Sequence, residues 1–489
     1  MPSGYAPYPS VMSQRAVAGI VAYGAYIPFA RLDRRSISQT IGQGGGKGYR
    51  AVASYDEDTT SMAVEASRNL LASLPNAPEV ESLVFGTCSP PYLDKTNANA
   101  IHAALNLSVR TSAFDAVGSV RSGIGALVNA SSTTRTTLVA LSDTRTGLPG
   151  SSEEANGGDA AASFLFGASA VVAELIGSAH ATEEFLDRWR TPGAAASSIW
   201  EERYGESKYV PLAAPVVAEA LKDADVGTDD VAHAVVGGVH ARAVGVISRS
   251  LGVPPSALVD DITSQVGNAG IVATPLALIA ALEKATPGEV ILQVSVADGI
   301  DVLVWRATAA LPGYRAARDS LGARALTAQI AAGNSTLAYP TFLTWTGQLT
   351  REPPRRPDPD RPAAPPAGRA VGWKFGFEAS RCVECGTRHL PPMRVCLTCH
   401  SVDRMDSERL ANVKATVATF TIDHLAFSPS PPVVSAVIDF DGGGRFNCEM
   451  TDVDPATVHI GMRVEMTFRR LLTAQGVHNY FWKARPARS

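Results

Sequence analysis

The chain of 489 residues lacks an apolar run long enough to cross a bilayer, and it lacks a strong net charge. A transmembrane helix needs about 20 consecutive apolar residues, so the sequence predicts no membrane-spanning helix and no membrane partner. The formal net charge of −4 argues against nucleic acid as the main partner. Residues 1–16 lack the charged start and apolar run of a signal peptide, and we expect a flexible N-terminal extension there.

Cysteine is also scarce, with six in the whole chain. So few cysteines do not make a disulfide framework, which favours a reducing cytoplasm. Four of them stand in "CVECGTRHLPPMRVCLTC", as Cys382, Cys385, Cys396 and Cys399. Two CxxC pairs at this separation supply four thiolates, the tetrahedral set that zinc takes in closed sites. We therefore predict structural Zn²⁺; free or redox-active thiols are the alternative.

Strand-like and helix-like segments alternate over about the first 310 residues. "VESLVFGT" is typical of a buried strand, "NANAIHAALNL" of a helix and "TTLVALSDT" of another strand, and a similar plan recurs in the second half of this region. Such alternation predicts an α/β fold with a mainly parallel sheet and helices on both faces. We expect a duplicated, layered α/β/α/β/α domain over residues 17–330.

The composition changes after residue 330. "STLAYPTFLTWTGQLT" carries aromatic residues and is expected to dock as a helix, whereas residues 351–369, rich in Pro, Arg and Asp, predict a linker without a regular packed element. Residues 331–370 are thus interpreted as a docking segment and linker. Short β-runs with glycine-containing turns follow the cysteine cluster and predict a small β-barrel, so residues 371–489 form the last domain.

Two glycine-containing stretches invite a functional interpretation. "GQGGGKG", Gly42 to Gly48, is one residue short of a phosphate loop and has glycine where Ser or Thr is needed, so a flexible loop is predicted. "FDAVGSVRSGIGAL", residues 114–127, predicts a strand, a turn and a helix that begins near Arg121. Enzymes with such an elbow often keep a nucleophile at the turn, but the expected position holds Val120, which has no nucleophilic atom.

Residues 17–310 resemble the thiolase superfamily, with the hydroxymethylglutaryl-CoA synthase branch closest and the ketoacyl-acyl-carrier-protein synthases next. The resemblance is carried by "GIVAYGAYIPFARLD", "DEDTTSMAVEASRNLL", "GTCSPPYLDKTNA", "GGDAAASFLFG" and "VGNAGIVATPLALIAALEKATPGEVILQVS". Residues 338–486 resemble an OB-fold and zinc-ribbon family of acyl-CoA-associated proteins. Together these resemblances imply a coenzyme A thioester as substrate, an OB-fold barrel beside the zinc ribbon, and a homodimer formed through the large domain.

The resemblance also implies which residues occupy the positions of the synthase triad. The glutamate position holds Cys88, the cysteine position Val120 and the histidine position Gly237. Asn268, in "VGNAG", matches the asparagine that helps bind the thioester oxygen in related enzymes. His240 follows the histidine position and is a candidate base that could point back to the site.

Each of these candidates has a structural alternative. Cys88 is a candidate nucleophile, but a thiol reacts only when its pKa is lowered, and a small buried apolar residue is the alternative. His240 is alternatively a helix-start residue, and Asn268 a loop-capping amide. Asp143, in "LSDTRTG", is expected to hold the turn after its strand.

Three functions are consistent with these residues. The first is an acyl-CoA enzyme that makes or breaks a carbon–carbon bond, of aldol or Claisen type, without a covalent intermediate at Val120. The second is an acyltransferase that uses Cys88. The third is a non-catalytic acyl-CoA-binding scaffold, or a subunit that completes a partner enzyme. The fold alone does not decide between them.

Overall fold

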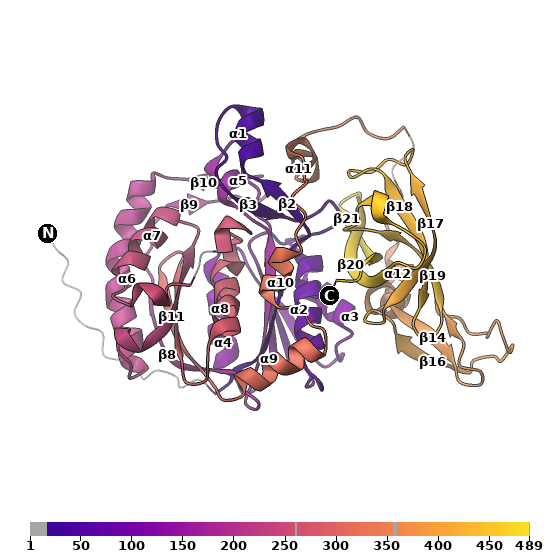
Figure 1. Ribbon diagram of the computed structural model, residues 1–489, viewed down its shortest axis with the longest axis horizontal. Coiled ribbons are helices and arrows are strands. Elements are labelled where there is room, and N and C mark those ends of the chain that lie inside the picture. Colours follow the sequence, from indigo (N-terminus) through magenta and orange to yellow (C-terminus); the bar gives the residue numbers. More distant parts are fainter. Residues whose placement is uncertain (1–16, 260–261, 356–358, 489) are drawn as a thin grey trace.

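The computed structural model describes residues 17–259, 262–355 and 359–488. A large α/β part is followed by a small part with a cysteine ribbon and a closed barrel. Figure 1 shows the barrel strands packed at one side of the large part. The extension predicted for residues 1–16 lies outside the described residues.

The large part is built on a nine-stranded sheet of order β11-β12-β13-β8-β1-β7-β6-β4-β5. Its strands are β1 (Gly19–Tyr26), β4 (Ser82–Thr87), β5 (Ser112–Val117), β6 (Thr137–Asp143), β7 (Ala160–Gly167), β8 (Ala173–Ala181), β11 (Val231–Gly238), β12 (Val290–Val296) and β13 (Ile300–Ala307). Every residue of β1, β4, β6, β7 and β12 is buried. Covering on both faces explains why these strands form continuous apolar runs in the sequence.

The order of the strands confirms the predicted duplication. The series β4-β6-β7-β1 in the first half corresponds to β11-β12-β13-β8 in the second, with one parallel pair followed by two antiparallel pairs in each. The halves join where Ile20 of β1 pairs with Ala173 of β8. Among the described residues, β5 has no counterpart in the second half, and it ends the sheet at one edge.

The sheet is mixed, and the prediction of a mainly parallel sheet was wrong. Only the β4–β5, β4–β6 and β11–β12 pairs are parallel. Long strands such as β12 and β13 are joined by a short turn, and a connection this short returns the chain in the antiparallel direction. Alternation of strands and helices did not reveal these direct strand-to-strand turns.

Helices cover the sheet in layers (Figure 1). Helix α2 (Thr59–Ala72) packs on β1, β6 and β7, and α6 (Glu202–Asp223) packs on β8 and β13. Helices α4 (Arg121–Ser131) and α8 (Ala273–Lys284) each contact strands of both halves, which places them in the central layer. The other α-helices and strands described in this part are α1 (Arg35–Ile41), α3 (Ala98–Leu105), α5 (Ser152–Asn156), α7 (Ala241–Ser250), α9 (Leu311–Ser320), α10 (Leu326–Ala331) and the short strands β2 (Ala30–Asp33), β3 (Tyr49–Val52), β9 (Arg188–Trp189) and β10 (Ser198–Ile199).

The connecting segment contains two short helices. Helix α11 (Tyr339–Trp345) docks as predicted, because Tyr339 and Phe342 are buried against the large part. Helix α12 (Ala364–Arg369) lies within the proline-rich run, where no regular element was predicted. Its prolines stand at the start of the helix, where the missing backbone N–H has no helical partner to lose.

The small part begins with a three-stranded ribbon of β14 (Glu378–Cys382), β15 (Arg388–His389) and β16 (Met405–Arg409). A closed five-stranded barrel follows, with β17 (Ala415–Asp423), β18 (Val433–Phe440), β19 (Arg445–Met450), β20 (Arg463–Ala474) and β21 (Val477–Pro486). Trp482 of β21 packs against Phe468 of β20 and against Phe377, which precedes β14, with ring centroids 5.3 and 5.7 Å away. Closure of the barrel means that its sheet has no end strand.

A buried ion network joins the two parts. Arg469 of β20 has no exposed side-chain surface and contacts Glu57 at 2.6 Å, Asp452 at 2.7 Å and Asp56 at 3.4 Å. Asp56 also pairs with Lys483 of β21 at 3.0 Å. Burial raises the pKa of Glu57 to about 7, against the opposing effect of Arg469. The carboxylates of the 56–58 stretch are therefore balanced by cations from the last two strands.

Glu65 of α2 is a second link between the parts. Its carboxylate contacts Arg485 at 3.0 Å and Arg68 at 2.6 Å, and it accepts a hydrogen bond from the Phe468 backbone N–H at 3.1 Å. Burial alone would raise the pKa of Glu65, but Arg68 and Arg485 outweigh it and lower the pKa to about 2. Glu65 is therefore ionised at neutral pH although it is buried.

Candidate functional site

The elbow forms as the sequence predicted, although β5 runs on to Val117. Gly118 turns the chain with φ 111°, a conformation that glycine adopts without strain. Val120 then takes the N-cap position of α4, where it makes no side-chain capping bond. Its side chain lines a cavity of about 530 Å³, here called the elbow cavity. Other lining residues include Cys88, Arg145, Asp187, Arg190 and Tyr209.

Cys88 lies directly after β4 and shares the elbow cavity with Val120. It is buried, and its thiol lies beside the Asp143 carboxyl group. Burial raises the pKa of Cys88 well above its ordinary value, and the Asp143 charge raises it further. The thiol is therefore protonated at neutral pH, which opposes a role as nucleophile.

Asp143 and Arg145 follow each other closely at the end of β6. The Asp143 carboxylate accepts hydrogen bonds from the backbone N–H groups of Thr144 at 3.2 Å and Ile271 at 3.4 Å. The first of these contacts is the turn-holding role expected from the sequence. Burial raises the pKa of Asp143, while Arg145, 3.7 Å away, opposes that effect. Asp143 thus connects the end of β6 to the Ile271 backbone beside the Cys88 thiol.

Arg145 connects the elbow to the next wall of the site. Its guanidinium contacts Glu153 at 2.6 Å, and Arg188 contacts the same carboxylate oxygen at 2.7 Å. Arg145 and Arg188 both line the elbow cavity and a smaller neighbouring cavity of about 100 Å³. We call this neighbour the His240 cavity, because His240 and Asn268 line it. The two cavities therefore share a charged wall, formed by Arg145, Arg188 and Asp187.

His240 occupies the N-cap position of α7, the helix-start place that was its alternative interpretation. Its Nδ1 accepts a hydrogen bond from the Ala243 backbone N–H at 3.1 Å. Its Nε2 lies 3.0 Å from the Glu202 carbonyl oxygen, to which it donates. Both ring nitrogens are thus engaged within the protein, an arrangement that holds a neutral imidazole in one tautomer.

Asn268 lies between the His240 cavity and a third cavity of about 480 Å³, which Gly237 also lines. The amide nitrogen of Asn268 donates to the Gly238 carbonyl at 2.7 Å, and its oxygen accepts from the Gly270 N–H at 3.0 Å. These bonds fix the side chain, as expected for a loop-capping amide, and one amide N–H remains for a ligand. A Cβ at Gly237 would lie 2.7 Å from a methyl carbon of Thr274, so the site is shaped around a glycine there.

The structure thus brings Cys88 and Val120 into one cavity, and places His240 and Asn268 in the adjoining one. Sequence reasoning missed Asp187 and Tyr209, which line the elbow cavity. The Tyr209 hydroxyl donates to the Asp187 carboxylate at 3.3 Å. Burial raises the pKa of both groups. Asp187 lies far from every quoted motif, so no local signal pointed to it.

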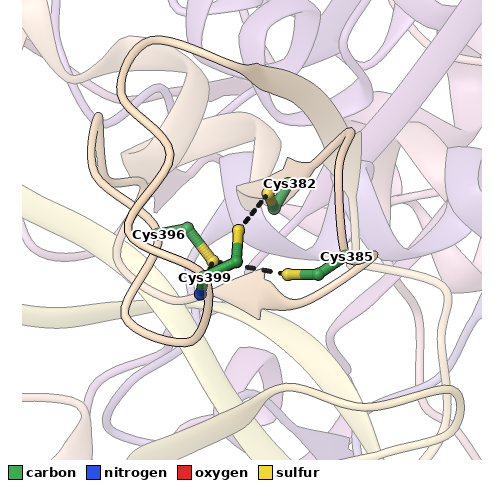
Figure 2. Close-up of side chains that lie close together, drawn as sticks. All are labelled: Cys382, Cys385, Cys396 and Cys399. Carbon is green, nitrogen blue, oxygen red and sulfur yellow. Dashed lines mark hydrogen bonds between the residues drawn. The ribbon is translucent and has the colours of Figure 1, made fainter.

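The four cysteines of the ribbon converge on one point (Figure 2). Their sulfur atoms all lie within 4.8 Å of one another, with 3.6 Å between Cys382 and Cys399 and 3.5 Å between Cys385 and Cys396. Zn–S bonds of about 2.3 Å in a tetrahedron place sulfurs about 3.8 Å apart. The backbone N–H of Cys399 points at the Cys396 sulfur at 3.5 Å, a contact that favours thiolate. The donor set therefore fits zinc.

Comparison with known proteins identifies both parts. The family model for the ChsH2 C-terminal OB-fold domain matches residues 408–469. A DUF35 domain-containing scaffold protein of Methanocaldococcus jannaschii is 33% identical over 123 residues, which is 24% of this chain and 86% of that protein. The hydroxymethylglutaryl-CoA synthase of Methanopyrus kandleri is 28% identical over 295 residues, 58% of this chain and 84% of that protein.

Through its C-terminal part the chain belongs to the DUF35 family, and its large part is similar to hydroxymethylglutaryl-CoA synthases. The fold of this synthase-like protein agrees with a crystal structure of HMG-CoA synthase complexed with CoA, at a TM-score of 0.55 and 16% identity. That match covers 66% of this chain and 89% of the other. The thiolase-like fold, the OB-fold and the four-cysteine cluster predicted from the sequence are thereby confirmed. In the described part of this synthase-like protein, no helix has the length and apolarity that crossing a membrane requires.

Proposed function

We propose that the chain is an acyl-CoA-dependent enzyme that makes or breaks a carbon–carbon bond of aldol or Claisen type without a covalent intermediate at Val120. The observation that carries this proposal is the elbow cavity itself. It combines an inert Val120 and a protonated Cys88 with the hydrogen-bonded pair Asp187 and Tyr209. Loss of the nucleophile therefore leaves a cavity that still holds groups for acid–base chemistry.

In this proposal Asp187 transfers the proton. In the cleavage direction its carboxylate accepts the hydroxyl proton of a β-hydroxyacyl thioester, the carbon–carbon bond breaks, and the electron pair moves into the thioester enolate. Asp187 and Asn268 both line the His240 cavity, and there the remaining amide N–H of Asn268 and nearby backbone N–H groups stabilise the enolate oxygen. A proton then returns to the enolate carbon, and Tyr209 keeps Asp187 oriented. Condensation follows the same steps in reverse.

The test measures turnover and the mass of the intact chain after incubation with acyl-CoAs of several lengths. We expect turnover without a mass adduct. A stable acyl adduct on Cys88 would instead support the acyltransferase alternative. If neither turnover nor an adduct is observed, the scaffold alternative remains. The DUF35 relatives, which are named scaffold proteins, favour that alternative. In that case a partner enzyme would supply the missing catalytic residues.

Two variants with matched controls test the assigned roles. Asn268→Ala is expected to lower kcat by about 10²–10³-fold with little change in acyl-CoA affinity. Asp187→Asn is expected to remove the acidic limb of the pH profile, in which activity rises with pH as this carboxylate loses its proton. Asn129→Ala and Asp229→Asn change exposed side chains of the same types elsewhere and should leave both quantities unchanged. If Asn268→Ala weakens binding as much as turnover, the oxyanion role is wrong.

A homodimer through the large part is also proposed. Strand β5 ends the sheet, so one row of its backbone groups has no neighbouring strand among the described residues. Phe114 and Val117 on this strand are 45% and 44% exposed. An edge strand with exposed apolar side chains is a ready surface for pairing with another copy. Sedimentation of the full chain, compared with Phe114→Lys, tests this proposal.

We further propose that the ribbon holds structural Zn²⁺. Four protein ligands would leave no open coordination position, and the bound ion would hold the two CxxC turns together. All six cysteines are free thiols in the structure, and Cys88 and Cys448 are buried apart from the ribbon. Free thiols together with a thiolate metal site support a reducing location such as the cytoplasm.

A further inference from the structure

A second large cavity lies between the two parts, away from the elbow. Its volume is about 860 Å³, within the range of about 300–1,000 Å³ that is usual for small-molecule sites. Helix α3 and the loop before it form one wall, and α12 forms another. The π-helical turn Gly372–Gly376 and the start of β21 complete it. We call it the interpart cavity, and neither the fold nor the comparisons assign it a role.

The lining of the interpart cavity is apolar with a cationic rim. Small and apolar side chains dominate, from Ala100 and Ala103 of α3, Ala367 of α12 and Val371 beyond it. Among the lining residues that the structure describes there are three cations, Lys95, Arg361 and Lys374, and no carboxylate. Such a surface suits a molecule with an apolar body and an anionic group.

Lys374 is the most informative of these cations. It is partly buried, and burial is the single cause that lowers its pKa, so no carboxylate of the described residues compensates its charge. The ammonium lies 5.9 Å from the centre of the Phe375 ring, which also lines the cavity. An ammonium group held against an apolar wall without a carboxylate favours an anion from outside the chain.

The loop before α3 forms a firm wall between this cavity and the elbow cavity. Tyr92 and Lys95 face the interpart cavity, whereas Pro90 and Leu93 line the elbow cavity. The Asn97 amide donates to the Tyr92 carbonyl at 2.9 Å, and its oxygen accepts from the Tyr92 N–H at 3.1 Å. The Tyr92 hydroxyl accepts from the His478 N–H of β21 at 2.7 Å. The wall is thus tied to both parts of the chain.

We propose that the interpart cavity is a second binding site, which takes an apolar acyl chain with an anionic end group. Lys374 pairs with the anion and the alanine-rich wall holds the chain. A free fatty acid and an acyl-CoA both carry this chemistry, the first through its carboxylate and the second through its phosphates. The site does not depend on catalysis at the elbow, because its lining is separate from Val120 and Asp187.

The test is calorimetric titration of the full chain with palmitate, palmitoyl-CoA and free CoA. We expect palmitate, palmitoyl-CoA or both to bind. Lys374→Gln removes the charge and should weaken this binding about three- to tenfold. Ala367→Trp fills the cavity from the short α12 and should abolish it. Whichever of the two ligands is more sensitive to Lys374→Gln identifies the anion that the site takes.

Lys222→Gln is the matched control, because Lys222 is an exposed lysine on α6 and outside the cavity lining. It should bind as the unchanged chain does, and circular dichroism should show all three variants folded. The proposal is overturned if neither acyl ligand binds, if only free CoA binds, or if Lys374→Gln and Ala367→Trp both leave binding unchanged. Turnover of a short-chain acyl-CoA by Ala367→Trp measures activity in the elbow cavity alone. The function proposed for the elbow cavity is therefore tested independently of binding in the interpart cavity.

Discussion

Arg469→Met should destabilise the chain strongly and in a pH-dependent manner. In the variant, Asp56 keeps Lys483 at 3.0 Å and Asp452 keeps Arg488 at 3.1 Å. Glu57 has Arg469 as its cation at 2.6 Å and would lose it. Removing one partner of a buried ion pair costs about 3–5 kcal/mol, and methionine replaces much of the lost volume.

The pH dependence follows from Glu57, whose pKa burial raises to about 7 with Arg469 still present. Without that cation the folded-state pKa rises further. Below pH 7 Glu57 is protonated in both proteins, so the decrease in the free energy of unfolding caused by the substitution does not change with pH there. Above pH 7 Glu57 loses its proton in the original chain and keeps it in the variant. The difference in the free energy of unfolding between the two proteins therefore grows with pH, by up to about 1.4 kcal/mol per pH unit.

The assay is urea unfolding at pH 6.5 and pH 8.5, followed by tryptophan fluorescence and circular dichroism. The two probes together show whether both parts unfold in one transition. Arg463→Met is the matched control on the same strand, because Arg463 forms a 2.6 Å pair with Asp441 that is largely exposed. We expect little measurable loss from it. If the two variants lose equal free energy of unfolding, burial rather than distance does not determine how much these ion pairs contribute to stability.

Three further predictions follow from features of the structure. Cys382→Ser should lose the metal and lower the unfolding midpoint of the C-terminal part, since metal binding and folding are coupled in such ribbons; elemental analysis that finds no zinc in the unchanged chain would contradict this. Val120→Cys should form no hydroxymethylglutaryl-CoA, because triad members act as a unit and the protonated Cys88 is no base; robust synthase turnover would show that the triad positions are misplaced. Acid should weaken the contact between the parts, because Glu65 has its pKa lowered to about 2. It contributes on the order of 3 kcal/mol above pH 4.5 that is lost as pH falls toward 2, and Glu65→Gln, measured by acid unfolding, should remove that dependence.

Local patterns made much of the fold predictable. The two CxxC pairs lie 14 residues apart and specify a ribbon with converging thiols, and their sulfurs do converge. The elbow was also readable, because a strand, a glycine turn and a helix are consecutive in sequence. The sequence pattern did not predict which strands run antiparallel, because two apolar runs can be joined either by a short turn or by a helical crossover. The helix α12 was missed because prolines in a first turn resemble those of a linker.

The candidate site was only partly predictable for a different reason. Cys88, Val120 and Asn268 stand in motifs, and the structure does place them around adjoining cavities. Asp187 and Tyr209 reach the elbow cavity from other elements, and only packing brings them there. The protonated state of Cys88 depends on burial beside Asp143, a contact 55 residues away in sequence that no spacing rule reveals.

The ion pairs between the two parts can form only late in the synthesis of the chain. Asp56 is translated 413 residues before Arg469. At about 5–20 residues per second, the ribosome needs roughly 20–80 s to cover that distance. Throughout this interval the nascent α/β part carries Asp56, Glu57 and Asp58 without the cations of β20 and β21 that pair with them. Its final packing therefore waits for β20 and β21 to leave the exit tunnel, so a chain stalled before the barrel exposes an acidic surface that holdase chaperones and proteases can distinguish from the finished protein.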